Sequence, residues 1–350
     1  MKIVLHILNT KTYSGAENVA ITIIKELEKD KRYKAYYVSP RGDIERKLIA
    51  EGIKYIPVDK LCTKELKRVV KEYKPDVIHA HDFRASIFSS IAAQGDTKII
   101  SHIHCNPSWI KKVNFYSILY AICSIRYKKI LTVSKAILDE YVLGGAIAHK
   151  SQVIGNIIDI EEIKIKSQEQ YGIPNFYDIC FCGRLSKEKD PIRFIKIICE
   201  IKKQIPNITA VIIGDGALME QCLELIKKEE LDKNIKMMGF LDNPFCIMKN
   251  CKLLCMTSKW EGYGLVAAES LALGKPVIAT NVGGITSIVD ESCGKTCNND
   301  ESMIDEITRL LMDNNYYKFK SANAKNKINK INNRAEYMQR LKDIYEKNRG

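Results

Sequence analysis

Short apolar runs, rich in β-branched residues, alternate along the chain with longer stretches of helical periodicity. The apolar runs predict strands at positions 3–8, 36–39, 77–80, 98–103, 129–133, 179–182, 209–213, 235–238, 252–256 and 276–279. Strands that alternate with helices imply parallel sheets with helical crossovers. The uniformly apolar run at 210–213 is typical of a sheet that is covered on both faces. The pattern therefore predicts an α/β protein.

The length of the chain favours two domains over one. Its 350 residues suit two domains of roughly 150 residues each. The polar stretch 163–175 is the expected linker between them. Apolar side chains at helical spacing between 335 and 345 predict a last helix in a basic tail. No apolar run approaches the roughly 20 residues that span a bilayer, and the N-terminus has no features of a signal peptide, so we expect a cytoplasmic protein.

Loops that follow strands are the expected place of function, because doubly wound sheets bind ligands at the carboxyl ends of their strands. The strongest such loop is SKWEGYGLVAAE at 258–269. Its two glycines let the backbone turn tightly, and the helix that follows offers free N–H groups to an anion. The carboxylates of Glu261 and Glu269 can face one ligand and accept hydrogen bonds from sugar hydroxyls.

Two other loops after strands carry candidate phosphate contacts. Arg184 and Lys189 follow the strand at 179–182. A guanidinium fork and a flexible ammonium suit a diphosphate, and both would stabilise the charge on a departing nucleoside diphosphate. After the first strand, Gly15 would let backbone amides approach a phosphate or a sugar. Taken alone, the Gly15 segment also reads as an ordinary strand-to-helix turn.

Four histidines form two pairs at strand ends, His79 with His81 and His102 with His104. Alternation along a strand places both members of a pair on one face. Four imidazoles near one sheet edge could bind a metal, but no acidic Asp-x-Asp or His-Glu-x-x-His string accompanies them. We therefore expect no metal, a buried structural role for His79, and a polar contact to the substrate from His104.

Charge is distributed unevenly behind the net value of +13. Residues 1–150 hold 26 Lys and Arg against 15 Asp and Glu, residues 151–317 hold 19 against 24, and residues 318–350 hold 10 against 3. A basic first half suggests a face that meets an anionic partner, such as a membrane, a phosphorylated substrate or nucleic acid. Aromatic residues interleave with cations between 109 and 129, which suits either a membrane interface or a packed helix.

Together these strings resemble the family-4 retaining glycosyltransferases of the GT-B fold, in which two Rossmann-like doubly wound domains face each other across a cleft. The resemblance rests on SGAE, HIHCN, LTVSK, VIGNIID, CGRLSKEKD, IIGDG, EGYGL with its following glutamate, and GKPVIATNVGG. It implies an acceptor-binding domain over 1–162 and a donor-binding domain over 163–334. A C-terminal helix, 335–350, would return to the first domain. The HIHCN region looks closest to enzymes of capsular or exported polysaccharide.

The resemblance also implies a reaction. A sugar would move from a nucleoside diphosphate, expected to be UDP, to a glycan or lipid-linked acceptor with retention of configuration. No metal or other cofactor would be required. The residues implied as donor contacts are Arg184 and Lys189 on the diphosphate, Glu269 on the ribose, Glu261 on the sugar hydroxyls, the amides of Gly262, Tyr263, Gly264 and Leu265, Gly15 near the β-phosphate, and His104 on the transferred sugar.

Two other functions stay open from the sequence. A nucleotide-sugar epimerase of the same two-domain build would need no acceptor, but the EGYGL string with its glutamate favours transfer. A basic protein that binds nucleic acid is disfavoured because no recognition module is found and the second half is acidic. We therefore expect a nucleotide-sugar donor and a glycan acceptor as partners, with peripheral contact to an anionic membrane and no nucleic acid.

Overall fold

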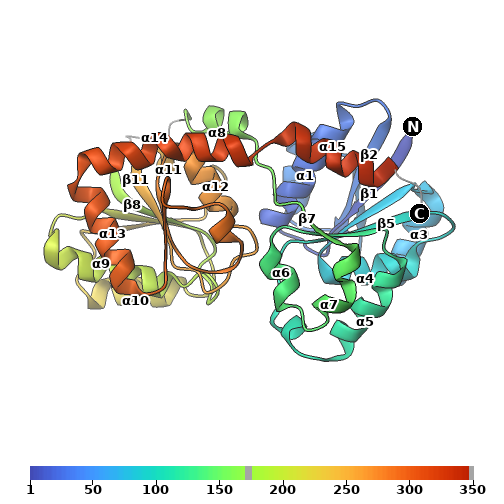
Figure 1. Ribbon diagram of the computed structural model, residues 1–350, viewed down its shortest axis with the longest axis horizontal. Helices are drawn as coiled ribbons and strands as arrows, with labels where there is room; N and C mark the ends of the chain where they lie inside the picture. The colour runs from blue at the N-terminus through green and yellow to red at the C-terminus, as the bar shows by residue number, and fades with distance from the viewer. Residues whose placement is uncertain (170–175, 347–350) are drawn as a thin grey trace. The chain divides into compact units, whose positions relative to one another are not determined.

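The computed structural model describes residues 1–169 and 176–346, which form two α/β units (Figure 1). The first unit comprises Met1–Ile157 and Asn333–Gly350, and the second comprises Ile158–Asn332. The expected boundary after residue 162 falls inside helix α8 (Ile160–Lys166), whose Ile163 lies in the hydrophobic core of the second unit. The chain is therefore helical up to Lys166, and the prediction of a linker was wrong for residues 163–166. Its positions 170–175 lie outside the described residues.

The first unit is built on a parallel seven-stranded sheet of order β3-β2-β1-β4-β5-β6-β7. The order reverses between β1 and β4, which makes this a doubly wound sheet. Its strands are β1 (Lys2–Ile7), β2 (Tyr33–Pro40), β3 (Tyr55–Val58), β4 (Val77–His81), β5 (Lys98–Ile103), β6 (Lys129–Thr132) and β7 (Ser151–Val153). Its helices are α1 (Gly15–Glu28), α2 (Ile44–Ala50), α3 (Thr63–Tyr73), α4 (Asp82–Ala92), α5 (Phe115–Cys123), α6 (Lys135–Glu140), α7 (Gly144–Ile147) and α15 (Arg334–Glu346).

The second unit repeats the plan with a parallel sheet of order β10-β9-β8-β11-β12-β13. Here the order reverses between β8 and β11. The strands are β8 (Tyr177–Cys182), β9 (Ala210–Ile213), β10 (Ile235–Gly239), β11 (Cys251–Met256), β12 (Val277–Thr280) and β13 (Gly294–Cys297). Besides α8, the helices are α9 (Pro191–Gln204), α10 (Met219–Lys228), α11 (Phe245–Lys249), α12 (Leu265–Ala272), α13 (Asp300–Met312) and α14 (Asn314–Ile331).

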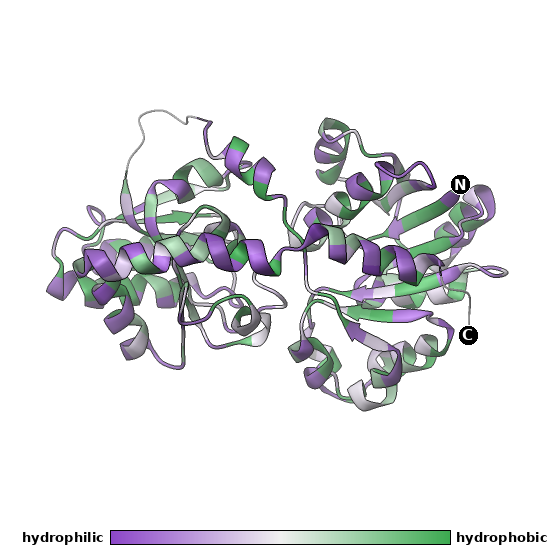
Figure 2. Ribbon diagram, turned by 45° about the horizontal axis from the view of Figure 1, so that its top comes forward, coloured by the Kyte–Doolittle hydropathy of each residue, from purple (hydrophilic) through white to green (hydrophobic). Residues whose placement is uncertain are grey.

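The sheet of the second unit is buried on both faces. Because side chains alternate along a strand, β8 sends Ile179 and Phe181 into one hydrophobic cluster and Cys180 into another. In Figure 2 the strands are mostly green, and the helices around them alternate between green and purple, as expected for amphipathic helices that cover a sheet. The α/β fold with two doubly wound sheets was predicted correctly, and each of the predicted strands is present.

Three short strands were missed, namely β3, β7 and β13. All three lie at the edge of a sheet, where fewer neighbours cover the side chains. Their residues are accordingly mixed, with Pro57 in β3 and a polar start to β7. A proline is tolerated at a sheet edge because its missing N–H interrupts no ladder bond. Apolar runs therefore identified the central strands better than the edges.

The last helix, α15, packs in the first unit, far in sequence from its neighbours. Its Tyr345 hydroxyl meets Nδ1 of His79 at 2.5 Å, and the Lys98 ammonium donates to the Tyr345 carbonyl at 2.9 Å. The Glu346 carboxylate accepts a bond from the Tyr33 hydroxyl at 2.6 Å. Lys342 pairs with Asp30 at 2.9 Å. Buried and charged contacts together hold this segment against strands that lie hundreds of residues earlier.

Candidate functional site

The switch point of the second sheet is the strongest candidate for a ligand site, because the loops after β8 and β11 diverge there. The Thr257 hydroxyl donates to the carbonyl of Asp190 at 2.8 Å, and the Lys259 amide donates to the carbonyl of Glu188 at 2.7 Å. The Lys259 ammonium pairs with the Asp190 carboxylate at 3.0 Å. The two loops are thus bound directly to each other.

Lys189 and Glu261, which the sequence placed in separate motifs, meet in this structure. The Lys189 ammonium forms an ion pair with Oε1 of Glu261, and the Ser258 hydroxyl donates to the same oxygen at 2.7 Å. The Glu261 side chain is 7% exposed and that of Lys189 is 28% exposed. A buried carboxylate is therefore neutralised by one cation, which itself reaches the surface.

A second loop, after β12, supports the Glu261 segment through its backbone. The amide of Gly284 donates to the carbonyl of Glu261 at 3.0 Å. A Cβ atom on Gly283 would lie 1.9 Å from that carbonyl oxygen, and one on Gly284 would lie 2.2 Å from the carbonyl of Gly262. No side chain fits at either position. The glycine pair within GKPVIATNVGG therefore allows two loops to touch backbone to backbone.

Helix α12 begins directly after this segment and has no side chain at its N-cap. Gly264 takes that position with a φ of +97°, a left-handed conformation that glycine adopts without strain. The first helical bond runs from the Ala268 amide to the Gly264 carbonyl at 3.2 Å. The amides of Leu265, Val266 and Ala267 precede that bond and have no acceptor within the helix. Together with the helix dipole, they form an anion site.

Glu269 lies one turn further along α12 and is half-buried. Burial raises the pKa of this carboxyl to about 8, and the charge of Lys166 opposes that shift. Arg184, by contrast, is exposed in the loop after β8. Its charge helps to lower the pKa of Glu188, after the larger effect of a Ser186 hydrogen bond. The structure thus brings Lys189 to Glu261 but leaves Arg184 in solvent.

Gly15 lies at the switch point of the first sheet, where it is the first residue of α1. Its N-cap, Ser14, makes no side-chain capping bond and donates instead to Oε2 of Glu17 at 2.5 Å. Glu17 is fully buried, and burial raises the pKa of its carboxyl. In the sequence this glutamate stands out only as part of the string SGAE. A carboxylate at the third position of a helix is ordinarily an exposed capping residue, so the sequence did not predict that Glu17 is buried.

His104 follows β5, and both its ring and its backbone amide are hydrogen-bonded. Its Nε2 meets Nδ1 of His81 at 2.8 Å, and its backbone amide donates to Oδ1 of Asp82 at 2.9 Å. Asp82 has a φ of +69°, and burial raises the pKa of its carboxyl to about 7. His79 is buried with both ring nitrogens hydrogen-bonded, as predicted. Asp82 was missed, although it directly follows the first histidine pair.

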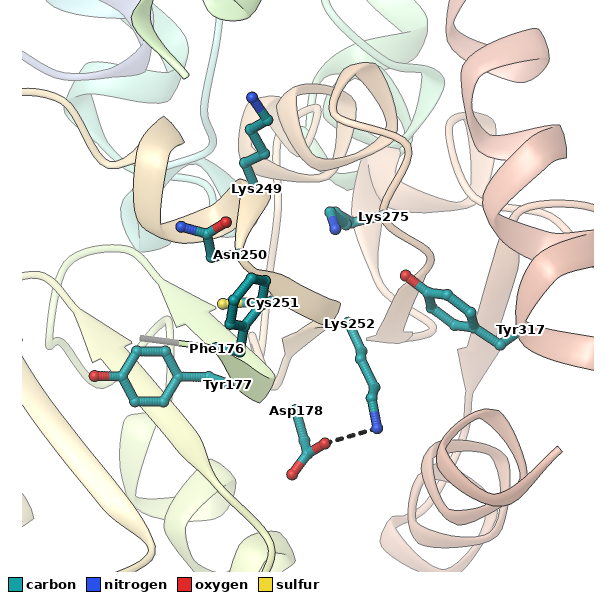
Figure 3. Close-up of a pocket in the computed structure, with 9 residues that line it drawn as sticks. All are labelled: Phe176, Tyr177, Asp178, Lys249, Asn250, Cys251, Lys252, Lys275 and Tyr317. Carbon is teal, nitrogen blue, oxygen red and sulfur yellow. Dashed lines mark ion pairs between the residues drawn. The ribbon is translucent and has the colours of Figure 1, made fainter. Parts of the chain in front are cut away.

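A pocket of about 270 Å³ lies elsewhere in the second unit (Figure 3). It is lined by residues at the start of β8 and β11, including Asp178 and Lys252, whose side chains pair at 3.0 Å. These are the amino ends of the strands, whereas the loops of the switch point follow the carboxyl ends. This pocket is therefore not the site described above.

Comparison with known proteins gives a consistent family. Residues 13–162 match the Glycosyltransferase Family 4 model, and residues 163–327 match the model of Glycosyl transferases group 1. The N-acetylgalactosaminyltransferase of Campylobacter jejuni that is named for a diphospho-undecaprenol substrate is 31% identical over 191 residues. That match covers 53% of this chain, which spans only about half (51%) of the relative.

Two further similarities extend over most of the chain. The O-antigen biosynthesis glycosyltransferase WclY of Escherichia coli is 23% identical, with 87% of this chain and 88% of the relative covered. The crystal structure of Anabaena Alr3699/HepE in complex with UDP-glucose superposes with a TM-score of 0.84 at 21% identity, covering 98% of this chain and 99% of that one. The chain therefore belongs to the glycosyltransferases of the GT-B fold, with a family-4 domain followed by a group-1 domain.

Proposed function

We propose that the protein is a retaining glycosyltransferase that moves a sugar from UDP to a glycan or lipid-linked acceptor in the synthesis of a surface polysaccharide. One observation carries this proposal: the Lys189–Glu261 ion pair lies next to the uncapped start of α12, at the switch point of the second sheet. A cation, a carboxylate and free amides in one place suit the phosphate and sugar parts of a nucleotide sugar.

The ion pair explains how Lys189 would act. Its ammonium, now bound to Oε1 of Glu261, would share its remaining N–H groups with the donor diphosphate. Glu261 would accept hydrogen bonds from sugar hydroxyls at Oε2, because Lys189 and Ser258 both contact Oε1. Arg184, which is exposed, would close on the diphosphate as its charge develops. We assign these cations, with the amides of residues 262–265 and the free amides of Val266 and Ala267 at the start of α12, the task that a metal ion performs in other transferases.

Glu269 would bind the ribose, and Gly15 and His104 of the first unit would contact the donor. The half-buried Glu269 carboxyl is neutral at physiological pH when unliganded, because its pKa is about 8. A protonated carboxyl can both donate to and accept from a ribose hydroxyl. His104 has an Nδ1 atom without a hydrogen-bond partner among the described residues. That nitrogen is the contact that we assign to the transferred sugar.

The substrate classes are inferred from relatives. Alr3699/HepE was crystallised with UDP-glucose, which motivates UDP as the nucleotide. The Campylobacter relative is named for a diphospho-undecaprenol substrate and WclY for O-antigen biosynthesis, which motivates a lipid-linked glycan acceptor. Retention follows from the family resemblance. Proton magnetic resonance of the first-formed product tests it, because an inverted anomeric centre would contradict the proposal.

A donor panel tests the transfer itself. Purified full-length protein would be incubated with UDP-sugars, with and without an undecaprenyl-diphosphate-linked sugar, and UDP release measured. We expect release that rises with the acceptor. Release without dependence on any acceptor, or conversion of the donor into an epimer, would contradict transfer.

Variants of one loop sharpen this test. Lys189→Ala and Glu261→Gln should each lower kcat/KM by roughly 10²–10³-fold, because each removes an interaction with charge or hydroxyls at the reacting end of the donor. Lys187→Ala is the matched control, since Lys187 is an exposed lysine two positions before Lys189. Equal losses in Lys187→Ala and Lys189→Ala would indicate a general charge effect and reject the assigned site.

We also propose that α5 brings the enzyme to an anionic membrane. Ser117, Tyr120 and Cys123 pack inward, whereas Phe115, Ile122 and the following Ile125 are 72%, 58% and 75% exposed. Exposed Lys111 and Lys112 precede the helix. Apolar side chains beside cations suit the boundary between headgroups and acyl chains. None of the described helices is long and apolar enough to cross a bilayer.

Vesicle flotation tests this surface. We expect binding to vesicles that contain phosphatidylglycerol, little binding to phosphatidylcholine alone, and loss of binding in Phe115→Ser/Ile122→Ser. Leu223→Ser is a suitable control, because Leu223 is a 49% exposed apolar residue on α10 of the second unit. Equal binding of the wild type and the double variant would refute membrane contact through α5.

A further inference from the structure

Five of the six histidines of the chain lie together in the first unit. Residues at adjacent positions of a parallel sheet share a face, and the strand register pairs His6 with His79 and His81 with His102. His104 lies two positions after His102, on the same face. None of these side chains is more than 8% exposed. The sequence shows two pairs of histidines, from which we expected no metal, whereas the fold adds His6 on a third strand and brings all five rings together.

The rings form two hydrogen-bonded chains. In one, the Tyr345 hydroxyl meets Nδ1 of His79 at 2.5 Å, and Nε2 of His79 meets Nδ1 of His102 at 3.1 Å. In the other, Nδ1 of His6 meets Nε2 of His81 at 3.1 Å, and Nδ1 of His81 meets Nε2 of His104 at 2.8 Å. All five rings are buried, and burial favours the neutral form of an imidazole.

Neutral rings leave this cluster with unmet bonding capacity. Each neutral imidazole has one donor and one acceptor nitrogen. Nε2 of His6, Nε2 of His102 and Nδ1 of His104 are buried without a partner among the described residues. Hydrogen bonds in the second chain can run in either direction. In both cases the nitrogen at one end has a lone pair without a donor, and the nitrogen at the other end has an N–H without an acceptor. Packing alone does not account for this, because apolar side chains would fill the same face without that penalty.

A metal ion would use the lone pair on Nε2 of His102 together with one nitrogen each from His81 and His104. His81, His102 and His104 each offer a nitrogen, and the three nitrogens lie within 4.8 Å of one another. Tetrahedral zinc with bonds of about 2.0–2.1 Å places its ligand nitrogens roughly 3.3 Å apart, so modest ring rotations would suffice. Neutral imidazoles are the form of histidine that binds metal.

A second group, His6 with His79 and His81, satisfies the same distance, and the hydrogen bonds decide between them. Both groups contain His81, whose two nitrogens are bonded, but the group with His6 adds His79, whose nitrogens are also both bonded, whereas the group with His104 adds His102, whose Nε2 has no partner among the described residues. If His102 instead binds through its unpartnered Nε2, its Nδ1–H donates to His79, which donates to Tyr345. Metal-bound histidines characteristically have such acceptors for their second nitrogen.

We propose that His81, His102 and His104 bind one divalent transition-metal ion of the zinc class. His81 would bind through Nδ1 and keep its Nε2–H on Nδ1 of His6. The three imidazoles would supply three of the four tetrahedral positions and a water molecule the fourth, and the ion would fix the ring of His104. It is separate from the donor diphosphate, whose charge the proposed function assigns to Lys189 and Arg184. His104 is the one residue that both proposals use, and it would bind the ion through Nε2 and leave Nδ1 to the sugar. Because the test below measures metal binding and not turnover, the metal site can fail while the transferase proposal stands.

Metal titration of the full-length, untagged protein tests the proposal. After removal of metals with a chelator, we expect one equivalent of Zn²⁺ to bind tightly and to raise the melting temperature. One equivalent of Co²⁺ should give the intense visible absorption of a tetrahedral site, without a thiolate-to-cobalt band in the near ultraviolet. The thiolate band matters because the chain has twelve cysteines that compete for these metals.

Variants locate the ion. His81→Asn and His102→Asn should each lose the stoichiometric binding and the melting shift, whereas His149→Asn should keep both. His149 is the sixth histidine and is exposed outside the cluster. Circular dichroism verifies that each variant is folded. Absence of stoichiometric binding to the wild type, a thiolate band, or retention of the ion by His102→Asn would each overturn the proposal, and the first two need no variant.

Discussion

Replacing Glu269 with glutamine should remove a pH-dependent loss of stability from the second unit. The pKa of this half-buried carboxyl is raised from 4.5 to about 8 by burial. A carboxyl with a raised pKa in the folded state binds its proton more tightly when folded. Its favourable contribution to the free energy of unfolding is therefore fully present below pH 4.5 and is lost as the pH rises through 8. Glutamine mimics the protonated form and has no such dependence.

The magnitude follows from the size of the shift. Each pKa unit corresponds to about 1.4 kcal/mol, so a carboxyl with this shift would make the folded state less stable than a permanently neutral group would by about 2 kcal/mol at pH 6 and about 5 kcal/mol at pH 9. Solvent reaches part of this side chain, and screening reduces the difference between the two pH values to about 1–2 kcal/mol. We expect the stability of Glu269→Gln relative to wild type to improve by that amount between pH 6 and pH 9.

The assay can isolate the second unit. The chain has two tryptophans, Trp109 in the first unit and Trp260 in the loop after β11. In a Trp109→Phe background, urea unfolding followed by fluorescence reports on the surroundings of Trp260. Equal changes in unfolding free energy from pH 6 to pH 9, with and without Glu269→Gln, would refute the argument. At pH 7.5 the variant should also keep UDP binding close to the wild-type level, because the glutamine amide, like the protonated carboxyl, can both donate to and accept from a ribose hydroxyl.

Three other variants test single contacts. Gly284→Ala should abolish UDP binding and lower the melting temperature, because its Cβ would lie 2.2 Å from a backbone carbonyl. Gly145→Ala is the control and should change neither, since a Cβ at that position meets nothing within 4 Å. Near-normal UDP binding in Gly284→Ala would reject the role of the loop after β12. Tyr345→Phe should cost the first unit about 1–2 kcal/mol, measured by Trp109 fluorescence, because it removes the buried bond to His79, and an unchanged midpoint would contradict this. Asp82→Asn should keep the left-handed turn and the oxygen that accepts from the His104 amide, whereas Asp82→Ala should lower the free energy of unfolding by about 2–4 kcal/mol. Equal stability of the two variants would show that the turn depends neither on the residue's tolerance of a positive φ nor on the accepting oxygen.

Several features were predictable because their cause is local. The central strands are apolar runs buried on both faces, and burial of that kind is visible as composition. Gly264 was identified because a tight turn before a helix requires a residue that tolerates a positive φ. The order of strands and helices then placed the important loops at the carboxyl ends of both sheets.

Other features depend on contacts between distant segments. Lys189 and Glu261 are 72 positions apart and were assigned to different parts of the donor, yet they form one ion pair. The sequence likewise gave no reason to bury Glu17 or to pair His79 with Tyr345, which lie 266 positions apart. Edge strands such as β13 also escaped, because at an edge the neighbours, and not the apolar content, determine pairing.

The sequence by itself thus determined the fold class, the family and the loops that carry the candidate site. Periodicity, turn residues and short motifs each act within a few residues and leave a local signature. Only the tertiary structure decided which charges neutralise each other, which carboxyls are buried, and that five imidazoles share one sheet face. Those properties arise from strand order and register, which bring together residues that no local pattern connects.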